Sequence, residues 1–198
     1  MEPRYRVTRA RTRSHNVRIV PGAGEEQRIV EIQIGRPPRS TVTVAAVCPY
    51  GLPLVARTPP RLDDGTPFPT IYYLTCPVAV RAIGTLEADG TMIEMRDRLR
   101  DDAPLRSAYA DAHARYVADR DAIEVLEPAV SAGGMPDRVK CLHALYAHEK
   151  ADANPIGATV AERIEPLACP GPCVADLGNG VLEAVPGHPG WKGKGRRR

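Results

Sequence analysis

Aromatic residues and long apolar runs are what this chain of 198 residues has least of. Aromatics make up 5% of the residues, with one Trp and one Phe, so a core must be filled mainly with Val, Ala, Leu and Ile. No apolar run approaches the roughly 20 residues of a transmembrane helix, and no apolar stretch follows the charged N-terminus as in a signal peptide. We therefore expect a cytoplasmic protein without a transmembrane segment.

Several catalytic and binding motifs are also missing. The chain has no GxxxxGKS/T phosphate loop, no glycine-rich dinucleotide fingerprint, no Ser–His–Asp signature and no CxxC pair. It does have five cysteines. In the cytoplasm these are expected to be reduced, so they are buried thiols, catalytic groups or metal ligands and not a disulfide framework.

Positive charge is concentrated at the two ends of the chain. Residues 1–18 hold six Arg and one acidic residue, residues 191–198 hold five Lys or Arg, and the part between them has 16 basic and 23 acidic residues. Basic tails can bind phosphates or anionic lipids, but neither tail interleaves aromatics for base stacking, apart from Trp191, which argues against nucleic acid. We expect a basic, weakly ordered arm and linker over 1–40, a single globular domain over 41–174, and a flexible basic tail over 175–198.

The local patterns run from strands to helices, which predicts an α+β fold with a small antiparallel sheet packed by four or five helices. β-branched and apolar residues predict strands near 41–47, 54–57 and 70–75, and a weaker alternation suggests a short strand at 28–34. Prolines in first turns and apolar residues at intervals of three and four predict helices over 77–88, 91–100, 103–126, 136–150 and 156–164. Little regular structure is expected after Pro166, where proline and glycine dominate.

Three cysteines lie at junctions between the predicted elements. Cys48 and Cys76 each follow a predicted strand and precede a proline, and Cys141 lies in the first turns of a predicted helix. If strands 41–47 and 70–75 pair with their C-terminal ends close together, the three thiols can converge. Three thiolates from separate segments suit a zinc ion or an iron–sulfur cluster.

His148 is the candidate for a fourth ligand if the metal is zinc. It follows Cys141 by seven residues, which places both side chains on one face of an α-helix. The alternative is that all three cysteines are small buried core residues, because free cysteine is among the most buried residue types.

A glycine loop precedes the same predicted helix. Gly133 and Gly134 allow close approach of the backbone, and the free N–H groups of a helix start favour a small anionic ligand. Arg138 and Lys140 would add positive charge. A flexible turn into a helix explains the same residues equally well.

Cys169 and Cys173 form a secondary thiol pair in a segment rich in proline and glycine. The pair could bind a metal or form a redox disulfide. Because the spacing is C-x3-C and not CxxC, two exposed thiols near the end of the chain are the favoured interpretation.

Several blocks of the sequence carry a family resemblance. They are Cys48-Pro-Tyr-Gly-Leu-Pro53, Asp64-Gly-Thr-Pro-Phe-Pro-Thr70, Tyr73-Leu-Thr-Cys-Pro77, Ser131-Ala-Gly-Gly-Met-Pro-Asp-Arg-Val-Lys-Cys-Leu-His143 and Asn154-Pro155. With them the chain resembles domain-of-unknown-function family 501, a largely actinobacterial group, over roughly residues 41–174. The resemblance implies no reaction. Members often lie beside genes for a septum-formation initiator and an exopolyphosphatase, which implies, by association, a link to cell division or polyphosphate metabolism.

Two functions of different classes follow. The first is a site formed by Cys48, Cys76 and Cys141, next to an anion-binding helix start; with an iron–sulfur cluster that has an open iron, it predicts a lyase or a sulfur-transfer enzyme. The second is a non-enzymatic adaptor for cell division or septum formation, which binds a protein partner through the basic tails and the helix over 103–126. A weaker third hypothesis is a phosphate or nucleotide binder that uses only the 131–140 loop.

Overall fold

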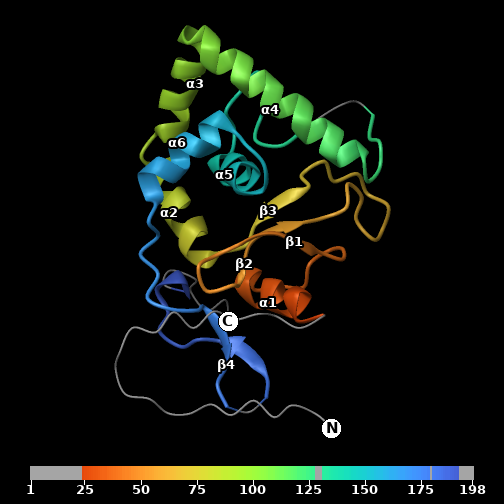
Figure 1. Ribbon diagram of the computed structural model, residues 1–198, viewed down its shortest axis with the longest axis vertical. Helices are drawn as coiled ribbons and strands as arrows, with labels where there is room; N and C mark the ends of the chain where they lie inside the picture. Colours follow the sequence, from red (N-terminus) through yellow and green to blue (C-terminus); the bar gives the residue numbers. More distant parts are fainter. Residues whose placement is uncertain (1–23, 128–130, 179, 192–198) are drawn as a thin grey trace.

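A computed structural model of the chain describes residues 24–127, 131–178 and 180–191. It confirms the α+β class, with six α-helices, a three-stranded antiparallel sheet and a two-stranded hairpin within the described residues (Figure 1). The helices are α1 (Glu25–Ile34), α2 (Pro77–Ala88), α3 (Thr91–Asp101), α4 (Ala103–Asp121), α5 (Leu142–Ala151) and α6 (Pro155–Ile164). The strands are β1 (Thr43–Val47), β2 (Pro53–Arg57), β3 (Tyr72–Leu74), β4 (Val174–Asp176) and β5 (Leu182–Ala184).

The basic residues at the two ends, 1–18 and 192–198, lie outside the described part of the chain. The expectation that these ends are flexible basic tails therefore stays a prediction. Of the helices in the described ranges, none is long and apolar enough to cross a membrane.

The three-stranded sheet has the order β1-β2-β3, with both neighbours antiparallel to the central strand. Because β1 and β3 are both antiparallel to β2, they run in the same direction and end at the same edge of the sheet. The register shows this directly, since Val47 pairs with Pro53 and Leu74 pairs with Val55, near the start of β2. The residues that follow these two strands are therefore neighbours in space.

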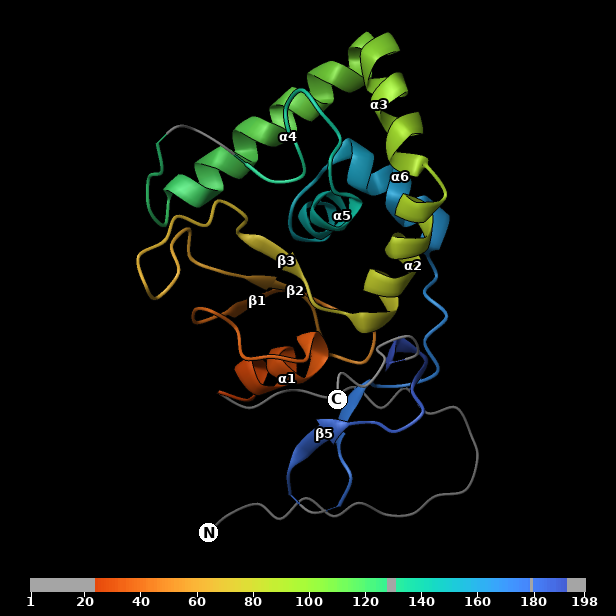
Figure 2. The same cartoon turned by 180° about the vertical axis from the view of Figure 1, so that it is seen from behind.

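Helices cover both faces of this sheet (Figures 1 and 2). Successive residues of β2 point to opposite faces, and both Val55 and Ala56 are buried. Val55 belongs to the main core with Leu145 of α5, whereas Ala56 packs with Val30 of α1. Helices α2 and α6 pack around α5, and α3 and α4 form an arm that reaches over it (Figure 2).

The segment 28–34, for which the sequence suggests a strand, is part of helix α1, so that interpretation is wrong. The helix buries Ile29, Val30 and Gln33, which have the three-and-four spacing of one helix face. It ends at Gly35, whose φ of 75° is the left-handed conformation that favours glycine. The alternation seen in the sequence is too short to distinguish the two-residue period of a strand from the 3.6-residue period of a helix.

The helix expected from Pro136 begins six residues later, at Leu142, so this boundary is also wrong. The residues before it form turns. Gly133 and Gly134 have φ values of 68° and 94°, and their carbonyl groups accept hydrogen bonds from the amides of Lys140 (2.7 Å) and Arg138 (2.9 Å). These contacts direct the chain away from a helical path until Cys141, the N-cap residue.

Regular structure continues beyond Pro166, contrary to expectation. Strands β4 and β5 form a hairpin, and a short 3-10 helix, Pro189–Trp191, follows them. Val174 is fully buried in a small core with Ile29 of α1 and Leu52. The end of the described chain is therefore held against the N-terminal helix, beside the sheet edge where β1 and β3 end.

Candidate functional site

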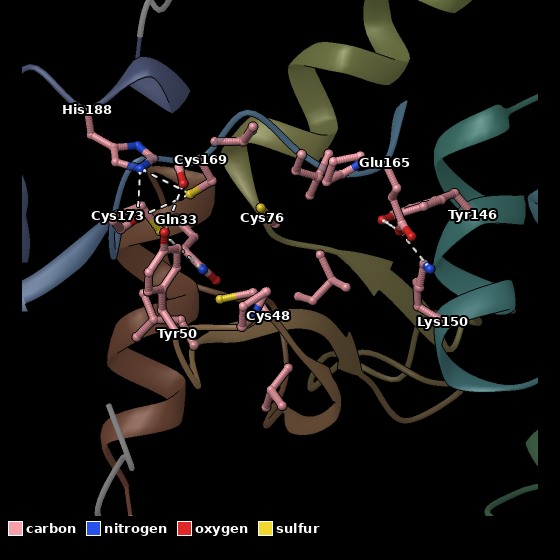
Figure 3. Close-up of a pocket in the computed structure, with 18 residues that line it drawn as sticks. Gln33, Cys48, Tyr50, Cys76, Tyr146, Lys150, Glu165, Cys169, Cys173 and His188 are labelled. Atoms are coloured by element: carbon pink, nitrogen blue, oxygen red, sulfur yellow. Dashed lines mark hydrogen bonds and ion pairs between the residues drawn. The ribbon is translucent and has the colours of Figure 1, made fainter. Parts of the chain in front are cut away.

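A pocket of about 460 Å³ lies at this edge of the sheet. Four of the five cysteines line it, namely Cys48, Cys76, Cys169 and Cys173 (Figure 3). Cys48 directly follows β1, and Cys76 is the N-cap residue of α2. All the cysteines of the chain are free thiols. The pocket thus gathers thiols from three separate segments.

Hydrogen bonds anchor the C-terminal thiols in the pocket wall. Tyr50, in the turn after β1, donates its hydroxyl to the carbonyl of Cys169 at 2.8 Å, across 119 residues of sequence. The amide of Val185 donates to the carbonyl of Cys173 at 2.9 Å. Both anchors hold the backbone of these cysteines, and both residues line the pocket (Figure 3).

Two N–H groups lie close to these sulfur atoms. The Gly190 amide donates to Nδ1 of His188 (3.2 Å), so the neutral ring carries its proton on Nε2. Nε2 donates this proton to the Gly171 carbonyl at 3.1 Å and lies 3.5 Å from Cys169 Sγ. Nε2 of Gln33 lies 3.6 Å from Cys173 Sγ. Burial lowers the pKa of His188, which favours this neutral form.

Burial raises the pKa of three pocket thiols, Cys76, Cys169 and Cys173, and so favours their neutral form. It raises the pKa of Cys76 to about 11 and that of Cys173 to about 12, and neighbouring thiols add to both shifts. A nucleophilic cysteine needs the opposite, a pKa lowered by a nearby cation. The lysine of the pocket, Lys150, is instead paired with Glu165 at 2.6 Å. The arrangement therefore suits metal ligation, because a bound metal supplies the positive charge that deprotonates a thiol.

The opposite wall of the pocket is polar as well. The Tyr146 hydroxyl donates to Glu165 at 2.6 Å, and this carboxylate also accepts from Lys150 (Figure 3). Burial alone would raise the pKa of Glu165, but the hydrogen bonds from Lys150 and Tyr146 lower it. An ionised carboxylate and an ammonium group thus face the thiols across the pocket.

The structure does not bring Cys141 together with Cys48 and Cys76. Cys141 lies within 4.8 Å of a carboxylate oxygen of Glu87, in the last turn of α2. Cys76 caps the opposite end of that helix, and a rise of 1.5 Å per residue separates the two ends by about 16 Å. Cys48 and Cys76 therefore lie at one end of α2, and Cys141 lies at the other.

Glu87, Cys141 and His143 form a group that could hold a metal ion, with one ligand atom from each within 4.8 Å of the others. The carboxylate of Glu87 accepts from the Leu142 amide at 2.7 Å and lies 3.2 Å from Nδ1 of His143. Hydrogen bonding to Cys141, then to Val80 and Glu87, raises the pKa of His143 to about 9, although burial opposes this.

His148 is not near either group of thiols and is placed to pack. Its ring stacks on Tyr72 and meets Tyr116 edge to face, with centroids 5.8 and 4.9 Å away. Asn154 accepts from the Gly157 amide through its oxygen, so its nitrogen donates to His148 Nδ1 at 3.1 Å. The helical spacing from Cys141 does not apply, because Cys141 precedes the helix and has an extended φ of −154°.

The anion site predicted at Gly133, Gly134, Arg138 and Lys140 lies in the turns that precede α5, and none of these residues is in the first turn of the helix. The amides of Arg138 and Lys140 are used in the turn, and both side chains are exposed. A Cβ on Gly133 would lie 2.5 Å from Leu145 Cδ2, so this glycine serves close packing. Anion binding at these four residues stays a prediction.

Most of the residues around the two sites carry no recognisable signal in the sequence. Gln33 was assigned to a strand, and His188 lies in a segment where no structure was expected. Glu87 falls within the helix predicted over 77–88, and no local pattern marks it as a ligand. In a continuous helix over 136–150 His143 would point away from Cys141, but Cys141 is not helical. The alternating spacing of Cys141 and His143 is the one local signal that could have paired them.

The fold and this pocket define an α+β protein with a cysteine-lined cavity. A family model described as "protein of unknown function (DUF501)" matches residues 44–162, and the chain belongs to this family, as the resemblance implied. Comparison with curated proteins and with solved structures finds no match. The matched region contains Cys48, Cys76 and Cys141, whereas Cys169 and Cys173 lie beyond it.

Proposed function

We propose that the protein binds an iron–sulfur cluster through Cys48, Cys76, Cys169 and Cys173. The observation that supports this most is that four free thiols from three segments line one pocket. Cysteine thiolates are the usual ligands of such clusters, with four in the common arrangement. The proposal keeps the two sheet-edge cysteines singled out in the sequence and replaces Cys141 with the C-terminal pair.

The spacing of the thiols favours a cluster over a single zinc ion. Zn–S bonds of about 2.3 Å place the four ligand atoms of a tetrahedral site about 3.8 Å apart. Among the described residues, three donors lie within 4.8 Å of one another at Glu87, Cys141 and His143. In this described part of the chain, no three thiols of the pocket are that close to one another. A multinuclear cluster has ligands further apart than a single ion, so it fits this wider arrangement better.

The polar groups beside the sulfur atoms support the same proposal. N–H groups directed at the sulfurs stabilise a negatively charged, cysteine-ligated cluster and adjust its reduction potential. The Gln33 amide nitrogen, 3.6 Å from Cys173 Sγ, donates to that sulfur, whereas Nε2 of His188, 3.5 Å from Cys169 Sγ, is a polar neighbour whose proton goes to the Gly171 carbonyl.

The number of ligating cysteines determines the class of activity. Four ligands leave no open iron, which suits electron transfer or a structural role. Three ligands leave one iron open to a small anion, which could be held by Lys150 on the facing wall, and this is what a lyase or a sulfur-transfer enzyme needs. The four-thiol pocket favours the first arrangement.

Anaerobic purification and reconstitution with iron and sulfide tests the proposal. We expect about four iron and four sulfide per chain, as in a [4Fe–4S] centre. Replacing any one of Cys48, Cys76, Cys169 or Cys173 with Ala should remove most of this iron. The measurements are iron and acid-labile sulfide content, visible absorption, and EPR after reduction.

Cys141→Ala is the matched control and should keep the full cluster. Circular dichroism of each variant separates loss of the cluster from loss of the fold. A folded wild-type chain that takes up no iron would contradict the proposal. If only three of the four variants lose the cluster, the open-iron arrangement and its lyase or sulfur-transfer chemistry replace the closed one. A variant with all four pocket cysteines replaced by Ala can also be tested for complementation of a deletion strain. Full complementation by this quadruple variant would favour the non-enzymatic adaptor.

A further inference from the structure

The second thiol-containing group lies where the last turn of α2 meets the first turn of α5. Glu87 belongs to α2, Cys141 is the N-cap residue of α5, and His143 lies in its first turn. One ligand atom of each lies within 4.8 Å of the others. Both the Glu87 and the His143 side chains keep about a quarter of their surface exposed, 23% and 26%, so a solvated ion can enter.

Two backbone contacts orient this group. Nε2 of His143 lies 3.0 Å from the Val80 carbonyl, which can only accept, so Nε2 carries a proton and donates it. The Leu142 amide donates to Glu87 Oε1 at 2.7 Å, which holds the carboxylate at the start of α5. Nδ1 is therefore directed to the carboxylate, 3.2 Å away, and to the thiol side of the group.

In the neutral ring, Nδ1 presents a lone pair to a carboxylate oxygen, which is another acceptor. Such a contact is favourable only when a proton or a metal ion lies between the two atoms. Histidines that bind metals usually donate their other ring N–H to a backbone carbonyl or a carboxylate, as His143 does to Val80. The orientation is thus that of a metal ligand.

We propose that Glu87, Cys141 and His143 bind a single zinc-type ion with an open fourth position. Zn–N and Zn–O bonds of about 2.0–2.2 Å place such ligands about 3.3 Å apart, close to the 3.2 Å between Nδ1 and the carboxylate. A mixed set of S, N and O donors selects zinc over magnesium or calcium, which prefer oxygen ligands alone. Water or an anionic substrate completes the coordination.

This site is independent of the cysteine pocket. Cys76 and Glu87 lie at opposite ends of α2, about 16 Å apart along the helix. An ion here also joins α2 to α5, so its binding stabilises the folded chain as well as creating an open, acidic metal position.

Cobalt titration of the full-length, metal-free protein tests the site, because Co²⁺ reports thiolate ligation and four-coordinate geometry through its absorption. We expect one cobalt per chain with a thiolate-to-cobalt band, displacement of this band by zinc, and a higher melting temperature with zinc. Glu87→Gln, Cys141→Ser and His143→Gln should each weaken binding about tenfold or more, and Cys141→Ser should remove the thiolate band.

Two controls identify the source of the signal. His113→Gln removes another partly buried imidazole, bonded to Ser131, and should leave the titration unchanged. In Cys169→Ser/Cys173→Ser, which disables the first pocket, the band should persist.

A band that survives Cys141→Ser would overturn the proposal. So would a wild-type protein that shows neither a band nor zinc stabilisation, and this result would mean that a proton alone joins His143 to Glu87. Because the amide oxygen introduced by Glu87→Gln can still accept from the Leu142 amide, this variant tests metal binding in a chain that keeps its helix cap.

Discussion

Gly157→Ala is expected to lower the free energy of unfolding by about 3 kcal/mol, at the upper end of overpacking effects. Helix α6 packs against α5 at this residue. A Cβ there would lie 2.2 Å from the backbone oxygen of Leu145 and 2.6 Å from Cβ of Glu149. A backbone oxygen cannot move without its helix, so α6 must shift away from the core. In urea or thermal unfolding, the melting temperature should fall by roughly 6–12 °C.

Gly84→Ala is the matched control, because Gly84 is also a helical glycine. It lies within α2, and a Cβ there would meet nothing within 4 Å. The substitution should therefore stabilise the protein by about 0.5–1 kcal/mol through better helix propensity. Equal stabilities for Gly157→Ala and the wild type would show that α5 and α6 are not in close contact at this point.

Acid is expected to destabilise the protein through His148, by about 3 kcal/mol between pH 6.5 and pH 4. Burial lowers the pKa of this imidazole to about 4, with Arg115 acting in the same direction and Asp152 opposing it. The unfolded chain binds the proton near pH 6.5, before the folded chain does. The stability is therefore fully present above pH 6.5 and is lost as the pH falls toward 4.

His148→Phe tests this prediction, because it keeps a ring against Tyr72 and Tyr116 but cannot titrate. Loss of the hydrogen bond from Asn154 should cost about 1 kcal/mol at pH 7. The decline in stability between pH 6.5 and 4.5 should then be clearly shallower than in the wild type, as measured by urea unfolding at each pH. Parallel curves would contradict the assignment.

Comparison with a variant is needed because other groups titrate in or near this range. Burial also lowers the pKa of His113 and His188, so they contribute to the decline in both proteins. The raised pKa of His143, about 9, acts in a separate window, since its stabilisation is complete below pH 6.5 and is lost toward pH 9. Most carboxylates titrate below about pH 4.5, which sets the lower limit of the measurement.

Much of the fold could be predicted because its signals are local. β-branched runs indicated β1 and β3, and prolines in first turns indicated α2 and α6. The failures occurred where local signals were weak or where long-range contacts dominate. Segment 28–34 is too short to show its period clearly, and its helix is held by Ile29 against Leu52 and Val174. The turn before Leu142 depends on contacts such as the hydrogen bond from Tyr109 to the Arg138 carbonyl, at 3.1 Å.

The candidate site was predictable only in its first half. Cys48 and Cys76 follow strands on either side of β2, and an antiparallel sheet places the ends of both strands at one edge. The prediction grouped Cys141 with them because the sequence does not show that Cys76 and Cys141 lie at opposite ends of α2. His148 was assigned to Cys141 through a helical register that does not exist.

The sequence by itself determined most of the strands and helices between β1 and α6, because hydrophobic period, turn residues and prolines act over a few residues. It also determined that two cysteines follow β1 and β3. Only the tertiary structure decided which thiols meet. The carbonyl groups of Cys169 and Cys173 are held at the pocket by hydrogen bonds from the Tyr50 hydroxyl and the Val185 amide, and the length of α2 separates Cys141 from Cys76. Contacts of this kind depend on the path of the whole chain, and no local pattern encodes that path.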